Sequence, residues 1–188
     1  NHFSMSNFVH LIKSFASLDL MQKTSFDWSL FIATHGWTYH SSVSVAYIYF
    51  KSAFDCISHA KLLHKLSSYG ITGDLWFWIQ AFLSNRLQKV KVNASFSSTC
   101  EVISGVPQGS VLGPLLFNCF INDITDDLDP STSAKLFADD IKLYTEFSNI
   151  LPTNLQSQLD IICNWASLWQ LKISYTKCII LTIGPHTN

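Results

Sequence analysis

A chain of 188 residues that is 48% hydrophobic and 14% aromatic can bury a sizeable apolar core, which argues against a disordered polypeptide. Only 13% of the residues are charged and the formal net charge is −1, so the basic excess typical of nucleic-acid-binding proteins is missing. The five cysteines have no metal-binding spacing, and we find neither a long apolar run nor a signal peptide. These features predict an intracellular protein, in the cytoplasm or nucleus, with free thiols and no membrane-spanning segment.

Regular patterns begin at Val43, where an apolar run to Phe50 predicts a buried strand. Apolar residues then recur at helical spacing between Ser58, a good N-terminal cap, and Gly70, a good terminator, which predicts a helix. A second helix is expected from about Asp74. The alternation over residues 89–93 predicts a further strand with a polar outer face.

A loop from Ser104 to Pro114, with glycine at every fourth position, leads into an apolar helix expected from near Ser110 to about Ile124. Two strands joined by a tight turn, an amphipathic helix and a final strand pair follow, over residues 135–137, 141–144, 155–169, 171–173 and 178–183. This order of elements predicts an α+β fold. We expect the strand over 43–50 to lie beside the hairpin in an antiparallel sheet, with helices packed on one face.

Two adjacent carboxylates, Asp139 and Asp140, lie in the predicted hairpin turn between apolar strands. Aspartate favours turns, so a solvated turn would explain them. They could instead hold a divalent metal ion for phosphoryl transfer, because Mg²⁺ prefers oxygen ligands shared between carboxylates and substrate phosphates. The glycine-rich loop is similarly open to two interpretations, a stiff connection or a close backbone approach to a ligand.

Five segments resemble, in the same order, the reverse transcriptases of non-LTR (LINE or jockey-like) retrotransposons. SGVPQGSVLGPLLF at 104–117 resembles motif B, and FADD at 137–140 resembles motif C. FKSAFDCISHAKLLHKL at 50–66 is similar to the sequence that follows the motif A aspartate. FLSNRLQKVKVNASFSS at 82–98 resembles the stretch between motifs A and B, and WQLKISYTKCIILTIG at 169–184 resembles motif D. The similarity covers about residues 43–184.

This resemblance implies an RNA-directed DNA polymerase, which acts by two-metal nucleotidyl transfer on an RNA template, a DNA primer and deoxynucleotides. Residues 43–188 would form the palm domain. Residues 1–42 would be a degenerate remnant of the fingers, and the thumb would be missing, as in a piece of a larger polyprotein. Asp139 and Asp140 would bind Mg²⁺ or Mn²⁺, and Lys177 would donate a proton to the leaving pyrophosphate.

Other roles follow from the same resemblance. The backbone carbonyl of Phe50 would help hold a metal ion, and the ring of Phe54 would block a ribose 2′-hydroxyl. Gln108 and Gly109 would lie against the nascent base pair. The basic cluster expected to touch template phosphates consists of Arg86, Lys89 and Lys91.

Tyr49 stands where the resemblance places the motif A aspartate. A phenol has an ordinary pKa of about 10, so it is neutral at pH 7 and a poor ligand for Mg²⁺. The sequence therefore predicts a degenerate catalytic position and a chain that is inactive as it stands. The alternative is a non-catalytic remnant that acts as a nucleic-acid-binding or protein-binding module. An unrelated metal-dependent phosphotransferase would explain only the aspartate pair.

Overall fold

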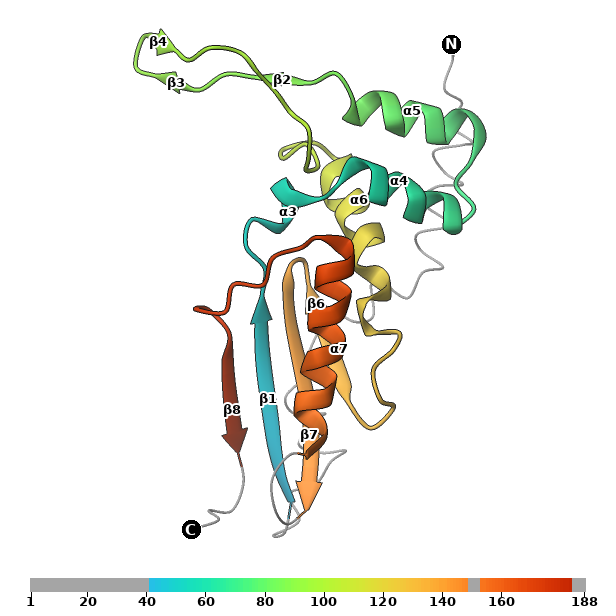
Figure 1. Ribbon diagram of the computed structural model, residues 1–188, viewed down its shortest axis with the longest axis vertical. Helices are drawn as coiled ribbons and strands as arrows, with labels where there is room; N and C mark the ends of the chain where they lie inside the picture. Colours follow the sequence, from blue (N-terminus) through green and yellow to red (C-terminus); the bar gives the residue numbers. More distant parts are fainter. Residues whose placement is uncertain (1–40, 149–152, 184–188) are drawn as a thin grey trace. The chain divides into compact units, whose positions relative to one another are not determined.

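The computed structural model describes residues 41–148 and 153–183 (Figure 1). The predicted fingers remnant over 1–42 therefore lies outside the described residues except for its last two. The chain divides into two compact units. We call the part up to Lys51 and from Asn122 onward the sheet unit, and Ser52–Ile121 the helical unit. No helix in the described ranges is long and apolar enough to cross a bilayer.

The sheet unit contains one antiparallel sheet of four strands in the order β6-β7-β1-β8. Its elements are β1 (Ser41–Tyr49), the 3-10 helix η2 (Asn122–Thr125), β6 (Ser133–Phe137), β7 (Asp140–Ser148), α7 (Thr153–Trp169) and β8 (Ile179–Ile183). The predicted strand over 43–50 thus lies beside the predicted hairpin. The prediction of an antiparallel sheet is confirmed.

Side chains alternate between the two faces of this sheet, so one set is buried in a common layer. On one face, buried residues of β1 and β7 lie opposite each other in pairs, Ser44 with Thr145, Ala46 with Leu143 and Ile48 with Ile141. The pair Val45 and Tyr144 is buried on the other face. The amphipathic helix α7 lies over the first face: Ala46 and Ile48 line a cavity of about 260 Å³ together with Leu159 and Ile162 (Figure 1). The hydrophobic contacts with α7 therefore identify the inner face of the sheet.

The last two predicted strands do not pair with each other, so this prediction was wrong. β8 pairs with β1, and Ile173 forms a single bridge with Phe50. With β7 on one side, β1 has a second edge whose backbone groups need partners. Both C-terminal segments use that edge, and a turn in which Lys177 N donates to Ser174 O connects them.

The helical unit contains α3 (Ala53–Cys56), α4 (His59–Ser68), α5 (Gly73–Leu83) and α6 (Leu112–Ile121), with the short strands β2 (Leu87–Gln88), β3 (Lys91–Val92), β4 (Ser95–Phe96) and β5 (Cys100–Glu101). The side chain of Ser58 caps α4 by accepting from Lys61 N, as its position in the sequence predicts. Ser110 Oγ accepts from Gly113 N and fixes the first turn of α6. Lys65 is buried between α4 and α6, where its Nζ donates to Phe120 O at 2.5 Å.

The strand predicted over 89–93 is interrupted. Lys91–Val92 pairs with Ser95–Phe96 through a turn at Asn93 (φ 56°), while Leu87–Gln88 pairs with Cys100–Glu101. All residues of these four short strands are exposed, so no buried face holds one continuous ladder together. The result is an arm, residues 86–103, that extends away from the helices of its unit (Figure 1).

Candidate active site

The hairpin between β6 and β7 presents the two predicted metal ligands. Phe137 and Asp140 form its last pair, so the loop consists of Ala138 and Asp139. Ala138 has a φ of 52°, the positive value that type II′ turns require at their first central residue. Glycine is more usual at such a position, so the sequence tolerates strain there. The turn places Asp139 at the tip and Asp140 at the start of β7.

Tyr49, the last residue of β1, lies directly opposite Asp140 in the register. Side chains of directly opposed residues in an antiparallel pair point to the same face. Tyr47 and Lys142 form the next pair on that face, and Lys142 Nζ lies 5.2 Å from the centroid of the Tyr47 ring. These four side chains occupy the face of the sheet that α7 does not cover.

The electrostatic surroundings of Asp140 are mixed. Burial raises the pKa of its carboxyl group, and the neighbouring charge of Asp139 raises it further. Lys142 and Lys177 act in the opposite direction, because each positive charge favours the ionised carboxylate. Lys177 therefore lies within electrostatic reach of Asp140, and its role as a proton donor stays a prediction. Among the residues predicted from the sequence, the structure brings Tyr49, Asp139, Asp140 and Lys177 together.

Backbone hydrogen bonds fix the end of β1. Ser174 N donates to Tyr49 O and Lys51 N donates to Lys172 O, both at 2.7 Å. Neither bond uses the carbonyl oxygen of Phe50, which lies between them in the chain. The role of that oxygen as a metal ligand stays a prediction.

The donor set at this site is small. In the described part of the chain, no group of three or more His, Cys, Asp or Glu side chains could hold a metal ion. Asp139 and Asp140 are accompanied by a phenol and by two lysines. Two divalent ions need several shared carboxylate oxygens, so these residues do not fit a two-metal centre.

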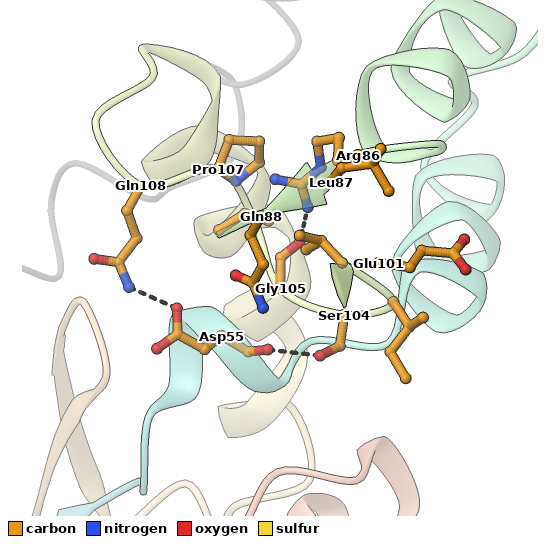
Figure 2. Close-up of a pocket in the computed structure, with 12 residues that line it drawn as sticks. Asp55, Arg86, Leu87, Gln88, Glu101, Ser104, Gly105, Pro107 and Gln108 are labelled. Atoms are coloured by element: carbon orange, nitrogen blue, oxygen red, sulfur yellow. Dashed lines mark hydrogen bonds between the residues drawn. The ribbon is translucent and has the colours of Figure 1, made fainter. Parts of the chain in front are cut away.

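In the helical unit, the loop from Ser104 to Gln108 is bound to α3 by hydrogen bonds to backbone carbonyl groups of α3 (Figure 2). Val106 N donates to Phe54 O, and Ser104 Oγ donates to Asp55 O, each at 2.8 Å. Gly105 has a φ of 80°, and a Cβ atom built on it would lie 2.7 Å from the Cα of Asp55. Only glycine allows this approach, which explains one of the regularly spaced glycines in the loop.

The amide of Gln108 is also held by α3. Its Nε2 donates to Asp55 Oδ1 at 2.6 Å (Figure 2). Both residues line a cavity of about 670 Å³, together with Arg86, Gln88 and the backbone of the loop. The sequence predicted a role for Gln108 and none for Asp55. In the structure, Asp55 is the hydrogen-bond partner of the Gln108 side chain.

The ring of Phe54 stacks on Phe117 of α6, with centroids 4.0 Å apart and planes inclined by 12°. Phe117 is fully buried, so it supplies a fixed support for the Phe54 ring. Gly109 is exposed and has a φ of 79°. The nucleotide contacts expected of Phe54, Gln108 and Gly109 stay predictions.

The three basic residues differ in their surroundings. Arg86 Nε donates to Leu83 O and its Nη2 donates to Gly105 O, both at 3.1 Å, so this side chain supports the loop. Lys89 and Lys91 are exposed on the arm, and Lys91 Nζ lies 5.5 Å from the ring centroid of Phe96. The prediction of one phosphate-binding cluster therefore rests mainly on the two lysines.

A hairpin with paired aspartates on an antiparallel sheet, and a glycine-rich loop held against the segment after β1, are features of a polymerase palm. The sequence pattern of the family described as reverse transcriptase (RNA-dependent DNA polymerase) matches residues 7–186. The chain belongs to this family.

Its curated relatives include polymerases of Drosophila mobile elements. The chain is 32% identical over 151 residues to the RNA-directed DNA polymerase from mobile element jockey of Drosophila melanogaster, covering 76% of this chain and 16% of the relative. It is 31% identical over 163 residues to the probable RNA-directed DNA polymerase from transposon BS of the same species, covering 77% and 17%. The recognition of a non-LTR retrotransposon reverse transcriptase domain is confirmed, and the chain spans about one sixth of these relatives.

Solved structures support the fold. Apo telomerase from Candida tropicalis, truncated from its C-terminal domain, has a TM-score of 0.71 at 10% identity and covers 95% of this chain and 40% of its own. Candida albicans telomerase in complex with a fragment of telomeric RNA has a TM-score of 0.69 at 12% identity, covering 95% and 34%. The predicted α+β palm fold is thereby confirmed.

We expect Gly105→Ala to lower the free energy of unfolding more than Gly109→Ala does. Both glycines have a φ near 80°, so alanine meets the same backbone strain at each. Only at Gly105 does the new Cβ collide with backbone, which adds about 2 kcal/mol. Chemical denaturation of the two variants measures the difference. Equal destabilisation would contradict the close approach of the loop to α3.

Proposed function

We propose that this chain is the palm of an RNA-directed DNA polymerase in which nucleotidyl transfer no longer takes place. The observation that carries the proposal is the position of Tyr49 directly opposite Asp140. In the family, Mg²⁺ or Mn²⁺ ions would bind between carboxylates of two neighbouring strands and stabilise the attacking and leaving oxygens. A tyrosine at the end of β1 supplies a neutral, bulky group where a carboxylate is needed.

The local charges support the loss of metal binding. Asp139 and Asp140 provide two carboxylates, while Lys142 and Lys177 bring two positive charges to the same place. Positive charges compensate part of the carboxylate repulsion without a metal ion. The fold therefore tolerates the Asp139–Asp140 pair even though Tyr49 supplies no third carboxylate.

The rest of the palm keeps groups that suit a nucleotide substrate. In this proposal Phe54, supported by Phe117, excludes a ribose 2′-hydroxyl, and Gln108 with Gly109 lies against the nascent base pair. Lys177 would supply a proton to the leaving pyrophosphate if the metals were present. The substrates of the ancestral enzyme would be an RNA template, a DNA primer and deoxynucleotides.

A second candidate function is binding of nucleic acid without catalysis, and the exposed arm favours it. The arm contains three basic residues, Arg86, Lys89 and Lys91, and one acidic residue, Glu101. It is therefore basic, although the whole chain has a net charge of −1. Phe96 is 63% exposed and lies beside Lys91. An exposed aromatic ring next to cations is a suitable surface for single-stranded RNA, because bases stack on the ring and phosphates contact the cations.

The central proposal is tested by primer extension. Residues 43–184 are grafted into an intact relative, once with Tyr49 and once with Tyr49→Asp. We expect extension only with the aspartate, because a lost metal ligand costs about 4 kcal/mol of transition-state stabilisation, or about three powers of ten in rate. A Tyr49→Phe graft is the matched control and should be as inactive as the tyrosine form. Equal rates for the tyrosine and aspartate grafts would refute the proposal.

The second candidate predicts that the double variant Lys89→Gln/Lys91→Gln binds single-stranded RNA more weakly than the unmodified chain. The dependence of log K on log salt should fall by about 0.7 for each removed phosphate contact. Fluorescence anisotropy at several salt concentrations measures both quantities. The double variant Lys61→Gln/Lys172→Gln removes the same charge outside the arm. If both double variants weaken binding equally, the arm is not the binding surface.

A further inference from the structure

The hydrogen bond between Gln108 and Asp55 determines in which direction each end of the Gln108 amide points. An ionised carboxylate can only accept hydrogen bonds, so the NH₂ group of Gln108 must point toward Asp55. The carbonyl oxygen Oε1 then points away from Asp55 (Figure 2). Within the described residues, no side chain or backbone group donates to that oxygen. Gln108 therefore offers a hydrogen-bond acceptor to a ligand.

The backbone around Asp55 is held independently of its carboxylate. Ser104 Oγ donates to Asp55 O, Val106 N donates to Phe54 O, and Gly105 N donates to Ile57 O at 2.8 Å. These bonds fix the position of α3 against the loop without any contribution from the hydrogen bond between Gln108 and Asp55. Asp55 and Gln108 are both exposed, so water competes for their bond, and its persistence depends on this prior positioning.

We propose that Asp55 is a positioning residue, which fixes the amide orientation of Gln108 and thereby selects a hydrogen-bond donor on the ligand. This inference rests on the proposed nucleotide-binding palm and deepens it. The donors that a nucleotide carries are its sugar hydroxyl and the exocyclic amino groups of its bases. A phosphate oxygen does not suit this position, because it would face the Gln108 carbonyl and the Asp55 carboxylate, both of which are acceptors.

The amide orientation is tested first without ligand, on the full chain, from the side-chain amide signals of Gln108 in nuclear magnetic resonance. In the unmodified chain one Nε2 proton should be shifted downfield and exchange slowly, because it is bonded to a carboxylate. Asp55→Ala should abolish both effects. Glu101→Ala, which removes an exposed carboxylate of the arm that does not bond to Gln108, should keep them.

The variant Asp55→Asn shows whether Asp55 fixes the orientation of the Gln108 amide or only contributes a contact to the fold. An asparagine can donate as well as accept, so Gln108 could bond to it in either orientation. We expect the downfield shift to shrink in Asp55→Asn while the midpoint of thermal unfolding stays the same. Unchanged Gln108 signals in Asp55→Ala would overturn the proposal, as would a Gln108 amide that exchanges like free glutamine in the unmodified chain.

The donor selectivity is tested with two probes, deoxyadenosine triphosphate with Mg²⁺ and tripolyphosphate with Mg²⁺. Both carry the same phosphate chain, but only the first has a sugar hydroxyl and a base amino group. We expect the nucleotide alone to move the Gln108 signals at millimolar concentration. Movement with tripolyphosphate to the same extent, or with neither probe, would overturn the assignment. An error in the proposed loss of activity would be detected by a different experiment, in which the graft that keeps Tyr49 would extend the primer.

Discussion

The antiparallel register between β1 and β7 is the constraint on which the candidate active site depends. The two strands pair over nine residues, from Ser41 with Ser148 to Tyr49 with Asp140. A shift of one residue would turn every side chain of β1 to the other face and remove Ala46 and Ile48 from the layer under α7. The buried layer under α7 therefore fixes the pairing at the far end of the strand. Tyr49 cannot move away from Asp140 without disrupting the core.

The same register explains how a catalytic site could be lost while the fold is kept. The residue at the end of β1 lies on the face opposite Ala46 and Ile48 and is only partly buried, so its identity contributes less to the core than theirs does. A carboxylate there would add to the charges of Asp139 and Asp140 and would need a metal ion or protons to balance them. Tyrosine removes that requirement, and β propensity favours it in a strand. If nucleotidyl transfer needs a carboxylate here, as we propose, stability and catalysis make opposite demands at this position.

Local patterns predicted much of the fold from the sequence. The helix after Ser58, the helix over 155–169 and the hairpin around Asp139 each have signals confined to a few neighbouring residues. The partner of β8 and the breaks in the arm were not predictable in this way, because they depend on which distant edges need hydrogen bonds. The role of Asp55 was missed for the same reason: its partner Gln108 is 53 positions away.

In the function proposed above, Tyr49 deprives the Asp139–Asp140 pair of divalent-cation affinity. The most direct measurement is Mn²⁺ binding to the full chain, followed by electron paramagnetic resonance, for the unmodified protein, Tyr49→Phe and Tyr49→Asp. We predict that Tyr49→Asp binds Mn²⁺ at least about tenfold more tightly than the other two, a difference of about 1.4 kcal/mol. Binding by the unmodified chain that is as tight as that of Tyr49→Asp, and that disappears in Asp140→Asn, would contradict the account.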